Sequence, residues 1–229
     1  MEARAEAGEM VIVAIDGPAG SGKSTVAKSL AERVDLPYLD TGAMYRAVTF
    51  ACIAAGIDPA DPDEATEVAR DMDLRMELDG TVTVNMVDAT TQIRGPEVTR
   101  AVSSVAAHPG VRAELVSRQR EWARRRGGGV LEGRDIGTVV FPDATLIVYL
   151  TASPEVRAAR RAGEVSDLDY DTVAADIARR DALDQTRETD PLRRADGALE
   201  VDTTYLTIEE VLDVLEHRLQ ETQSATPDQ

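Results

Sequence analysis

The fold of this chain is indicated first by residues 17–24, Gly17-Pro-Ala-Gly-Ser-Gly-Lys-Ser24. They match the phosphate-binding pattern G-x-x-x-x-G-K-[S/T] in full. Residues 11–15 before it form a continuous apolar run, which is typical of a buried parallel strand. Residues 24–34 after it are predicted to form a helix. In this context the glycines let backbone N–H groups converge on phosphate oxygens, and the amino terminus of the helix adds positive potential. The stretch therefore predicts a site for a nucleoside triphosphate; a glycine-rich turn without a ligand is the weaker alternative.

Two side chains of this loop have defined tasks. Lys23 should reach the β- and γ-phosphates, and the Ser24 hydroxyl should coordinate Mg²⁺. The motif alone does not separate a kinase from a GTPase, but Lys23 and Lys28 are the only lysines in the chain, which excludes a guanine-reading N-K-x-D segment. The residues of the loop that are predicted to bind ATP are Gly17, Pro18, Ala19, Gly20, Ser21, Gly22, Lys23, Ser24 and Thr25.

Strands and helices alternate along the rest of the chain. Strands are predicted at residues 37–40, 130–132, 145–150 and 199–201, and helical regions at 42–56, 96–126, 171–185 and 208–219. This alternation predicts a doubly wound α/β fold, in which ligands bind at the carboxyl ends of the strands. His108-Pro109-Gly110 should break the helical region at 96–126. Ser153 should cap a further helix, with Pro154 at its first position.

One segment departs from this alternation. Residues 74–87 alternate apolar and polar side chains around Asp79-Gly80, a pattern that predicts an antiparallel hairpin. A hairpin does not belong in a parallel sheet, so residues 60–100 are interpreted as a small inserted subdomain that interrupts a core formed by residues 10–59 and 101–220. A helical lid is expected at 157–175, with a mobile acidic loop at 163–171 inside it. Residues 1–9 and 221–229 are predicted to be disordered because they lack an apolar pattern.

Composition narrows the class of protein. The 229 residues carry a formal net charge of −17, which makes the chain a poor ligand for nucleic acid or anionic membranes. No apolar run approaches the ~20 residues of a membrane span, and the first ten residues lack the apolar core of a signal peptide. We therefore expect a cytoplasmic protein that binds no nucleic acid and no membrane. The single cysteine, Cys52, lies in an apolar helical stretch and is interpreted as a buried thiol.

Four segments carry a family resemblance: IDGPAGSGKST (15–25), LDTGAMYRA (39–47), EGRDIGTVVFPDA (132–144) and RRDALDQTR (179–187). With them the chain resembles the bacterial cytidylate kinases over residues 11–219, in order and in spacing. The first segment is shared widely among P-loop kinases, whereas the other three are more specific. The resemblance implies a P-loop nucleoside monophosphate kinase with a five-stranded parallel core and an inserted acceptor domain. It further implies a monomer that uses ATP and Mg²⁺ to phosphorylate CMP or dCMP.

A kinase of this class must hold two polyanions with their reacting oxygens nearly in line, so its catalysis is mostly positioning and charge stabilisation. Arginines are the expected means of holding the acceptor phosphate. The resemblance places Arg46, Arg134 and Arg187 there, with Tyr45 lining the same pocket. Together with Lys23 these three arginines form the predicted catalytic set. Each arginine could instead form a surface ion pair only.

Cytosine presents an exocyclic amine as a donor and N3 and O2 as acceptors. By resemblance, Thr41 and Asp135 face the amine, and Arg112 faces N3 and O2. Uracil has a carbonyl where cytosine has the amine, so Asp135 would oppose one acceptor with another. That unpaired contact is expected to weaken UMP binding by roughly 1–3 kcal/mol. The alternative is that Asp135 only pairs with the adjacent Arg134.

Predictions for the sugar and for the ATP lid rest on weaker patterns. The resemblance suggests Ser103, Arg180 and Asp184 for the sugar of CMP. Asp184 and Arg187 lie at i and i+3, however, and could form a simple helix salt bridge.

Arg157 and Arg161 lie at i and i+4 on the predicted helix after Pro154, so both could face ATP, or both could belong to a solvated basic face together with Arg160. Asp16 could bind the water shell of the metal, orient the acceptor phosphate, or only cap the loop.

Three rival functions remain open at this level. The same machinery could act on another acceptor, such as adenylate, uridylate, shikimate or gluconate. The chain could be a non-catalytic nucleotide-binding module, although Lys23, Ser24, Arg46, Arg134 and Asp135 are all present. A nucleic-acid-binding protein is disfavoured by the net charge of −17.

Overall fold

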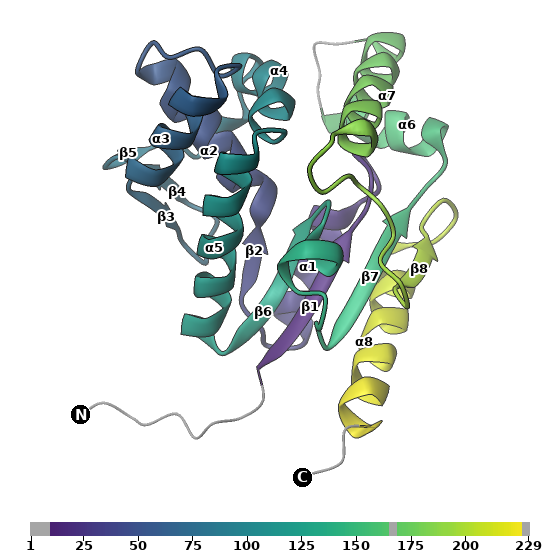
Figure 1. Cartoon of the computed structure of the whole chain (residues 1–229). Coiled ribbons are helices and arrows are strands. Elements are labelled where there is room, and N and C mark those ends of the chain that lie inside the picture. Colours follow the sequence, from purple (N-terminus) through teal and green to yellow (C-terminus); the bar gives the residue numbers. More distant parts are fainter. Residues whose placement is uncertain (1–9, 165–168, 226–229) are drawn as a thin grey trace, which may run out of the picture.

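The structure is a computed structural model that describes residues 10–164 and 169–225. In these ranges, parallel strands form a five-stranded sheet in the order β2-β6-β1-β7-β8 (Figure 1). The prediction of a doubly wound α/β fold with a five-stranded parallel core is confirmed. The strands are β1 (Val11–Asp16), β2 (Tyr38–Asp40), β6 (Gly128–Gly133), β7 (Leu146–Thr151) and β8 (Leu199–Asp202).

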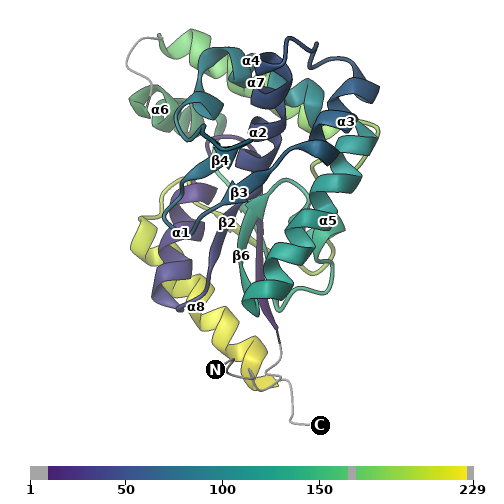
Figure 2. The ribbon, with the colours of Figure 1, turned by 90° about the vertical axis from the view of Figure 1, so that its left-hand side faces the viewer.

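Helices cover both faces of this sheet. Successive side chains of a strand point to opposite faces, so Ile12 and Ala14 of β1 pack into one apolar cluster while Val13 and Ile15 pack into the other. Figure 2 shows α1 and α8 on one side of the sheet and α5 on the other. Because β1 is buried on both faces, its apolar run is continuous rather than alternating. The covering helices are α1 (Lys23–Arg33), α8 (Ile208–Ala225), α2 (Thr41–Ala54) and α5 (Pro109–Arg126).

A second, antiparallel sheet lies beside the core, as predicted. It contains β3 (Leu74–Met76), β4 (Val82–Val84) and β5 (Val87–Asp88). The hairpin turn falls at Asp79-Gly80, where the Asp79 side chain accepts a hydrogen bond from Thr81 N at 2.9 Å. The third strand was not predicted, because it follows a two-residue turn with positive φ at Asn85 and Met86, and methionine rarely adopts that conformation.

Three helical segments flank this small sheet: α3 (Pro62–Asp71), η1 (Gln92–Arg94) and α4 (Pro96–Val105). The predicted break after α4 is confirmed, since α5 begins at Pro109. Proline lacks the N–H that a helix interior requires, and it is tolerated at the first helical position.

The remaining helices, α6 (Pro154–Glu164) and α7 (Tyr170–Thr186), stand across from α2 and α4 (Figure 1). Ser153 caps α6 as predicted, because its hydroxyl accepts a hydrogen bond from Val156 N at 3.3 Å. The loop expected at 163–171 is shorter in the structure than predicted. Its ends belong to α6 and α7, since Asp169 accepts a hydrogen bond from Thr172 N at 2.9 Å and caps α7. Residues 165–168 lie outside the described residues.

Helix α8 continues to Ala225, so the prediction of disorder from residue 221 was wrong for residues 221–225. Local contacts extend the helix: Glu221 pairs with Arg218 at 2.9 Å, and the Ser224 hydroxyl donates to Gln220 O at 2.8 Å. The leader at 1–9 and residues 226–229 lie outside the described residues. Within the described ranges, no helix combines the length and apolarity needed to cross a membrane.

Candidate active site

A cavity of about 540 Å³ opens at the carboxyl ends of the core strands, between α2 and α4 on one side and α6 and α7 on the other. The phosphate loop forms its floor. This is the sheet edge at which the fold class is expected to bind ligands. The predicted site residues that line the cavity are Ala19, Gly20, Ser21, Gly22, Lys23, Ser24, Thr25, Thr41, Tyr45, Arg46, Ser103, Arg134, Asp135, Arg161, Arg180, Asp184 and Arg187. Those that lie outside the lining are Gly17, Pro18, Arg112 and Arg157.

The first glycine of the loop has a steric role. Gly17 adopts φ +151°, and a Cβ atom at this position would lie 2.0 Å from the carbonyl oxygen of Leu150 on β7. Only glycine fits such a close approach of two backbones. Gly17 therefore shapes the loop from beneath and does not itself face the cavity.

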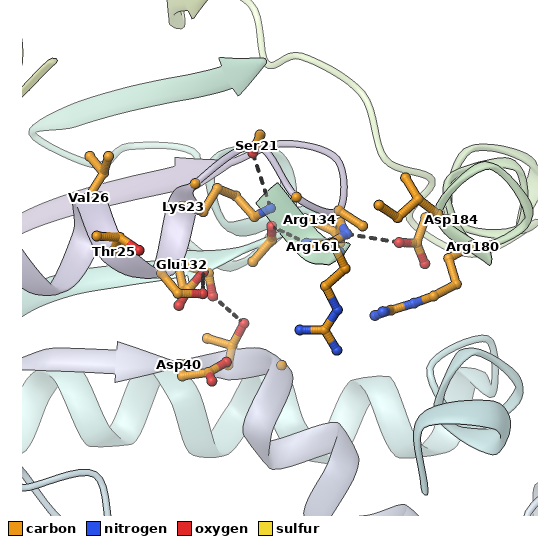
Figure 3. A pocket seen from close by; sticks show the side chains of 18 of the residues that line it. Ser21, Lys23, Thr25, Val26, Asp40, Glu132, Arg134, Arg161, Arg180 and Asp184 are labelled. Atoms are coloured by element: carbon orange, nitrogen blue, oxygen red, sulfur yellow. Dashed lines mark hydrogen bonds and ion pairs between the residues drawn. The ribbon is translucent and has the colours of Figure 1, made fainter. Parts of the chain in front are cut away.

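Lys23 points back across the loop. Its Nζ donates to the carbonyl oxygen of Pro18 at 2.6 Å and lies 3.5 Å from Ser21 Oγ (Figure 3). The side chain is only 5% exposed. Burial, with the neighbouring charge of Arg134, lowers the pKa of Lys23 to about 7. A phosphate that binds beside this amine would favour its protonated form.

A buried glutamate organises the other end of the loop. The Ser24 hydroxyl donates to Glu132 Oε2 at 2.9 Å, and the Tyr38 hydroxyl donates to the second carboxylate oxygen. The Thr41 hydroxyl donates to the backbone oxygen of Glu132 at 2.6 Å. Burial raises the pKa of Glu132. Sequence reasoning missed Glu132 and Tyr38, although a carboxylate at the end of a buried strand is a usable sign.

The oxygen donors here suit a magnesium ion. Ser24 Oγ, the Glu132 carboxylate and the Asp40 carboxylate all line the cavity. In the described part of the chain, no group of three or more His, Cys, Asp or Glu side chains could hold a metal ion by itself. Mg²⁺ usually binds through few protein oxygens together with substrate phosphates and water, so this donor set fits it.

Arginines from several elements converge on the cavity. Figure 3 shows Arg134, Arg161 and Arg180 projecting toward a common space. Burial and the neighbouring guanidinium groups lower the pKa of Arg46 to about 10, and they lower that of Arg180 as well. The Arg180 Nε atom has no hydrogen-bond partner among the described residues. Such a cluster favours a polyanion. Its members are Arg46, Arg94, Arg134, Arg160, Arg161, Arg180 and Arg187, of which Arg94 and Arg160 were not predicted as site residues.

Two of these arginines connect the inserted segment to the core. Arg46 on α2 donates to Ile93 O at 3.1 Å and to the Thr99 hydroxyl at 2.9 Å. Arg94 pairs with Asp40 Oδ2 at 3.0 Å, and the same carboxylate caps α2. The η1 segment therefore presents one more guanidinium to the cavity than the sequence indicated.

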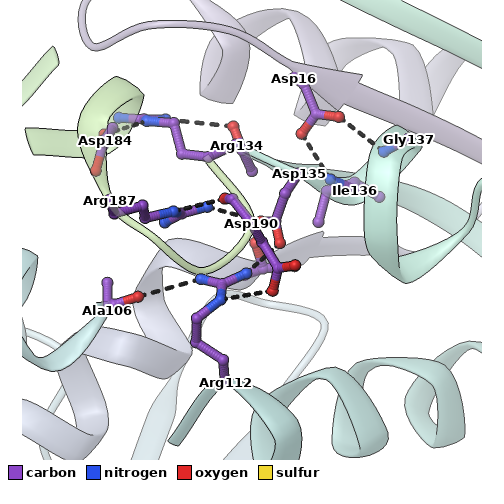
Figure 4. A network of polar contacts seen from close by, with 12 residues as sticks. Asp16, Ala106, Arg112, Arg134, Asp135, Ile136, Gly137, Asp184, Arg187 and Asp190 are labelled. Atoms are coloured by element: carbon purple, nitrogen blue, oxygen red, sulfur yellow. Dashed lines mark hydrogen bonds and ion pairs between the residues drawn. The ribbon is translucent and has the colours of Figure 1, made fainter. Parts of the chain in front are cut away.

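Asp135 lies at the centre of a charge network (Figure 4). Its carboxylate pairs with Arg112, and its Oδ1 lies 3.6 Å from Arg187 NH2. The alternative pairing with Arg134 does not form, because Arg134 pairs with Asp184 at 2.8 Å. Burial raises the pKa of Asp135, while the charges of Arg112 and Arg187 act in the opposite direction.

Arg112 lies deeper than the other predicted cytosine-binding residues. We expected its guanidinium to face cytosine, but it lies behind Asp135, is 2% exposed and does not line the cavity. It also binds Asp190 Oδ2 at 2.9 Å and Ala106 O at 3.2 Å. Its direct partner is therefore the carboxylate of Asp135, which does face the cavity. Tyr45 packs beneath Arg112, whose guanidinium carbon lies 5.7 Å from the ring centre.

Asp184 and Arg187 do not form the simple helix pair that was considered. Asp184 binds Arg134, whereas Arg187 Nε donates to the carbonyl oxygen of Asp190 at 2.6 Å. Arg187 lies at the carboxyl end of α7, where the chain turns, so the i, i+3 spacing does not bring the two side chains together.

Asp16, at the end of β1, binds the backbone of the segment that follows Asp135. Its two carboxylate oxygens accept hydrogen bonds from Ile136 N at 2.8 Å and Gly137 N at 2.7 Å, at the start of the π-helical turn η2 (Ile136–Val140) (Figure 4). It is 2% exposed and does not line the cavity, and burial raises its pKa to about 6. Asp16 thus holds the segment that follows Asp135 and caps neither the phosphate loop nor α1.

Helix α6 presents a different pair of arginines from the predicted one. Arg157 turns to Asp181 and the loop backbone, whereas Arg160 and Arg161 line the cavity. Arg160 donates to the Thr203 hydroxyl at 2.9 Å and to Thr203 O at 2.7 Å. The cavity wall beside Arg160 is partly apolar, formed by Val26, Leu206, Ile208 and Val211.

Comparison with known proteins adds the following. The family model described as cytidylate kinase matches residues 13–221. The cytidylate kinase of Streptomyces avermitilis is 46% identical over 219 residues, which cover 94% of this chain and 95% of the relative. That of Mycobacterium avium is 50% identical over 213 residues, which cover 90% and 93%. The structure of an uncharacterized protein from Eubacterium ventriosum superposes with a TM-score of 0.55 over 93% of this chain and 99% of the other, at 13% identity, a likeness that shows the fold alone.

Proposed function

The chain belongs to the cytidylate kinase family, and from this we propose that it transfers the γ-phosphoryl group of ATP to CMP or dCMP. One observation carries the proposal. A single cavity brings together a phosphate loop, a cluster of arginines and a buried carboxylate, Asp135. These three parts suit a donor triphosphate, an acceptor phosphate and a base that bears an amine.

ATP would bind at the phosphate loop. Its phosphates would accept hydrogen bonds from the loop amides and from Lys23. Lys23 would then give up its present hydrogen bond to Pro18 O. The partly apolar wall beside Arg160 offers the space for the adenine ring. Ser24 and Glu132 would hold Mg²⁺, which would supply positive charge to offset that of the phosphates.

CMP would occupy the other half of the cavity. We assign its phosphate to Arg46, Arg134 and Arg187, and its sugar to Ser103, Arg180 and Asp184, all of which line the cavity. Tyr45 lies in the same wall.

The cytosine amine would face two acceptors. Asp135 is one of them. The Thr41 hydroxyl is the other, because its proton is already donated to Glu132 O and only its lone pairs remain for a ligand. Both groups favour the amine of cytosine over the carbonyl of uracil, while Arg112 pairs with Asp135 and orients its carboxylate.

The chemistry needs little from the protein beyond position and charge. The attacking atom is an oxygen of the acceptor phosphate, which is already anionic, so no general base is required. Lys23 and the arginines hold donor and acceptor in line and offset the charge that develops between them. Because these cations come from α1, α2, η1, α6, α7 and the segment after β6, correct assembly of these elements around the cavity is itself a catalytic requirement.

We further propose a cytoplasmic monomer. ATP and CMP are cytoplasmic compounds, and the described residues of one chain supply a phosphate loop, a cluster of arginines and Asp135 to the cavity. Size-exclusion chromatography coupled to light scattering would give the mass of one chain, 24.7 kDa, if this is right.

The test of function is ADP release with ATP and a panel of CMP, dCMP, UMP and AMP. CMP or dCMP should be the preferred acceptor by kcat/KM. Preference for another monophosphate would retain the kinase and overturn the acceptor assignment. Absence of ADP release with every acceptor would favour a non-catalytic nucleotide-binding module.

A further inference from the structure

Asp181 is a buried carboxylate beside a loop that is built for anions. It lies on α7 and is 7% exposed. Its Oδ1 accepts a hydrogen bond from Ala19 N, within the phosphate loop, at 2.9 Å. Its Oδ2 pairs with Arg157 of α6. A carboxylate in this position opposes the binding of ATP electrostatically, so its presence calls for a compensating role.

Arg157 contacts the same loop residue, Ala19, and together with Asp181 it forms what we call the clamp on Ala19. Its guanidinium donates to Ala19 O at 3.0 Å and to Ala152 O, just after β7, at 3.2 Å. Both backbone polar groups of Ala19 are therefore bound by side chains that also bind each other. The N–H of Ala19 is directed to Asp181, which leaves the other amides of the loop to face a phosphate.

Close packing reinforces the clamp. The Ala19 side chain packs in a small apolar cluster with Ala158 of α6 and Val173 and Ile177 of α7. Gly20 adopts φ +75°, and a Cβ there would lie 2.9 Å from Arg157 O. The tip of the phosphate loop is thus embedded in the α6–α7 pair.

We propose that Asp181 is a positioning residue for the ATP site, acting through Ala19 and Arg157. It fixes the phosphate loop, which carries Lys23, relative to the helices that carry Arg161 and Arg180. This inference rests on the proposed function, and it gives Arg157 a different task from direct contact with ATP. In this arrangement the two helices and the loop tip move as one unit, and ATP meets cations whose spacing is already set.

The test compares Asp181→Asn with Asp176→Asn. Asp176 is an aspartate on the same helix that forms an exposed pair with Arg179 at 3.1 Å, so it is a matched control. In Asp181→Asn the amide NH₂ group opposes Arg157 and breaks the clamp with little change in volume. We expect the Kd of ATP from calorimetry and the KM for ATP to rise roughly 10-fold or more, because the variant loses a hydrogen bond between charged groups that positions the loop. The KM for CMP should stay within about twofold, and Asp176→Asn should change neither constant.

Arg157→Gln and the double variant separate the clamp from direct binding. If Asp181 acts through Arg157, the double variant should be no worse than the more damaged single variant. Additive losses would instead assign Arg157 to ATP and overturn the proposal. So would an Asp181→Asn variant that lowers the melting temperature but leaves the Kd of ATP unchanged, or one that weakens CMP as much as ATP.

The calorimetric arm measures ATP binding without turnover. A wild type that binds ATP but phosphorylates no monophosphate would overturn the proposed function while leaving the Asp181 comparison intact.

Discussion

At the scale of single residues, the proposed discrimination of bases depends on one carboxylate, Asp135, which two arginines contact. Arg112 pairs with one carboxylate oxygen of Asp135, Arg187 lies 3.6 Å from the other, and Asp135 lines the cavity. Asp135→Ala should lower kcat/KM for CMP and reduce its lead over UMP by roughly 5- to 150-fold, because an unpaired buried contact is worth about 1–3 kcal/mol. Steady-state kinetics with both acceptors measures the ratio.

Asp190→Asn is the control for this change. Asp190 also binds Arg112 but does not line the cavity. An equal loss of discrimination in Asp190→Asn would mean that the orientation of Arg112, and not the carboxylate of Asp135, reads the base.

The lowered pKa of Lys23 predicts that ATP binding is coupled to proton uptake. Its pKa is lowered to about 7, mainly by burial, so at pH 8 much of the amine is neutral before ATP binds. Phosphate oxygens favour the charged amine, so ATP binding should take up a proton at pH 8 and little at pH 6. Calorimetry in buffers of different ionisation enthalpy measures this uptake. Equal uptake at both pH values, or release of a proton at pH 8, would contradict it.

Asp16 predicts a dependence of stability on pH. Its pKa in the folded chain is about 6, against the ordinary value of 3.8, because of burial. Between these values the folded chain holds a proton that the unfolded chain has released. The stabilising contribution is therefore complete below about 3.8 and is lost as the pH rises through 6.

Urea unfolding of wild type and Asp16→Asn from pH 4 to 7 tests this. Wild type should gain up to about 3 kcal/mol relative to the variant as the pH falls, since one pKa unit corresponds to 1.36 kcal/mol. A difference that does not vary with pH would show that Asp16 titrates normally.

At the scale of elements, the turn η2 depends on its tight fit beneath Asp135. A Cβ at Gly137 would lie 2.3 Å from Ile147 on β7. Gly137→Ala should therefore lower the free energy of unfolding by about 1–3 kcal/mol. It should also raise the KM for CMP more than that for ATP, because η2 follows Asp135 directly.

Gly163→Ala is the counterpart in α6, where a Cβ meets nothing within 4 Å. Alanine there should raise the free energy of unfolding by roughly 0.5–1 kcal/mol through helix propensity. Urea unfolding of both variants would contradict the steric account if Gly137→Ala were as stable as wild type.

At the scale of the whole molecule, the chain combines a net charge of −17 with a cavity of converging arginines. Burial and neighbouring guanidinium groups lower the pKa of Arg46 and Arg180, so an anion that enters the cavity should stabilise the charged forms of both side chains. ATP at 100 times its Kd should stabilise the fold by about 2.7 kcal/mol, or roughly 5–10 °C in melting temperature for a domain of this size.

Scanning calorimetry with ATP, and with sodium chloride at equal ionic strength, distinguishes site binding from general screening. Chloride should produce a much smaller shift. Equal shifts would mean that the stabilisation comes from the overall charge and not from the cavity.

The features that depend on neighbouring residues could be predicted from the amino-acid sequence. An apolar run, three glycines and a lysine are enough to specify strand, loop and helix over residues 11–34, because sterics and backbone hydrogen bonding act locally. The hairpin at Asp79-Gly80, the helix break at Pro109 and the cap at Ser153 were found in the same way. The family resemblance, confirmed over residues 13–221, added the expected members of the acceptor site as predictions.

The pairing of the charged side chains could not be predicted in this way, because it depends on the packing of distant elements. Helical spacing places Arg157 and Arg161 on related faces, but the packing of α6 against the loop turns Arg157 to Asp181 and Arg160 to the cavity. Arg112 pairs with Asp135, and Ser24 donates a hydrogen bond to Glu132. Both contacts join residues that are far apart in the chain. Such pairs form wherever burial makes an unpaired charge costly, and that depends on which elements the fold brings together.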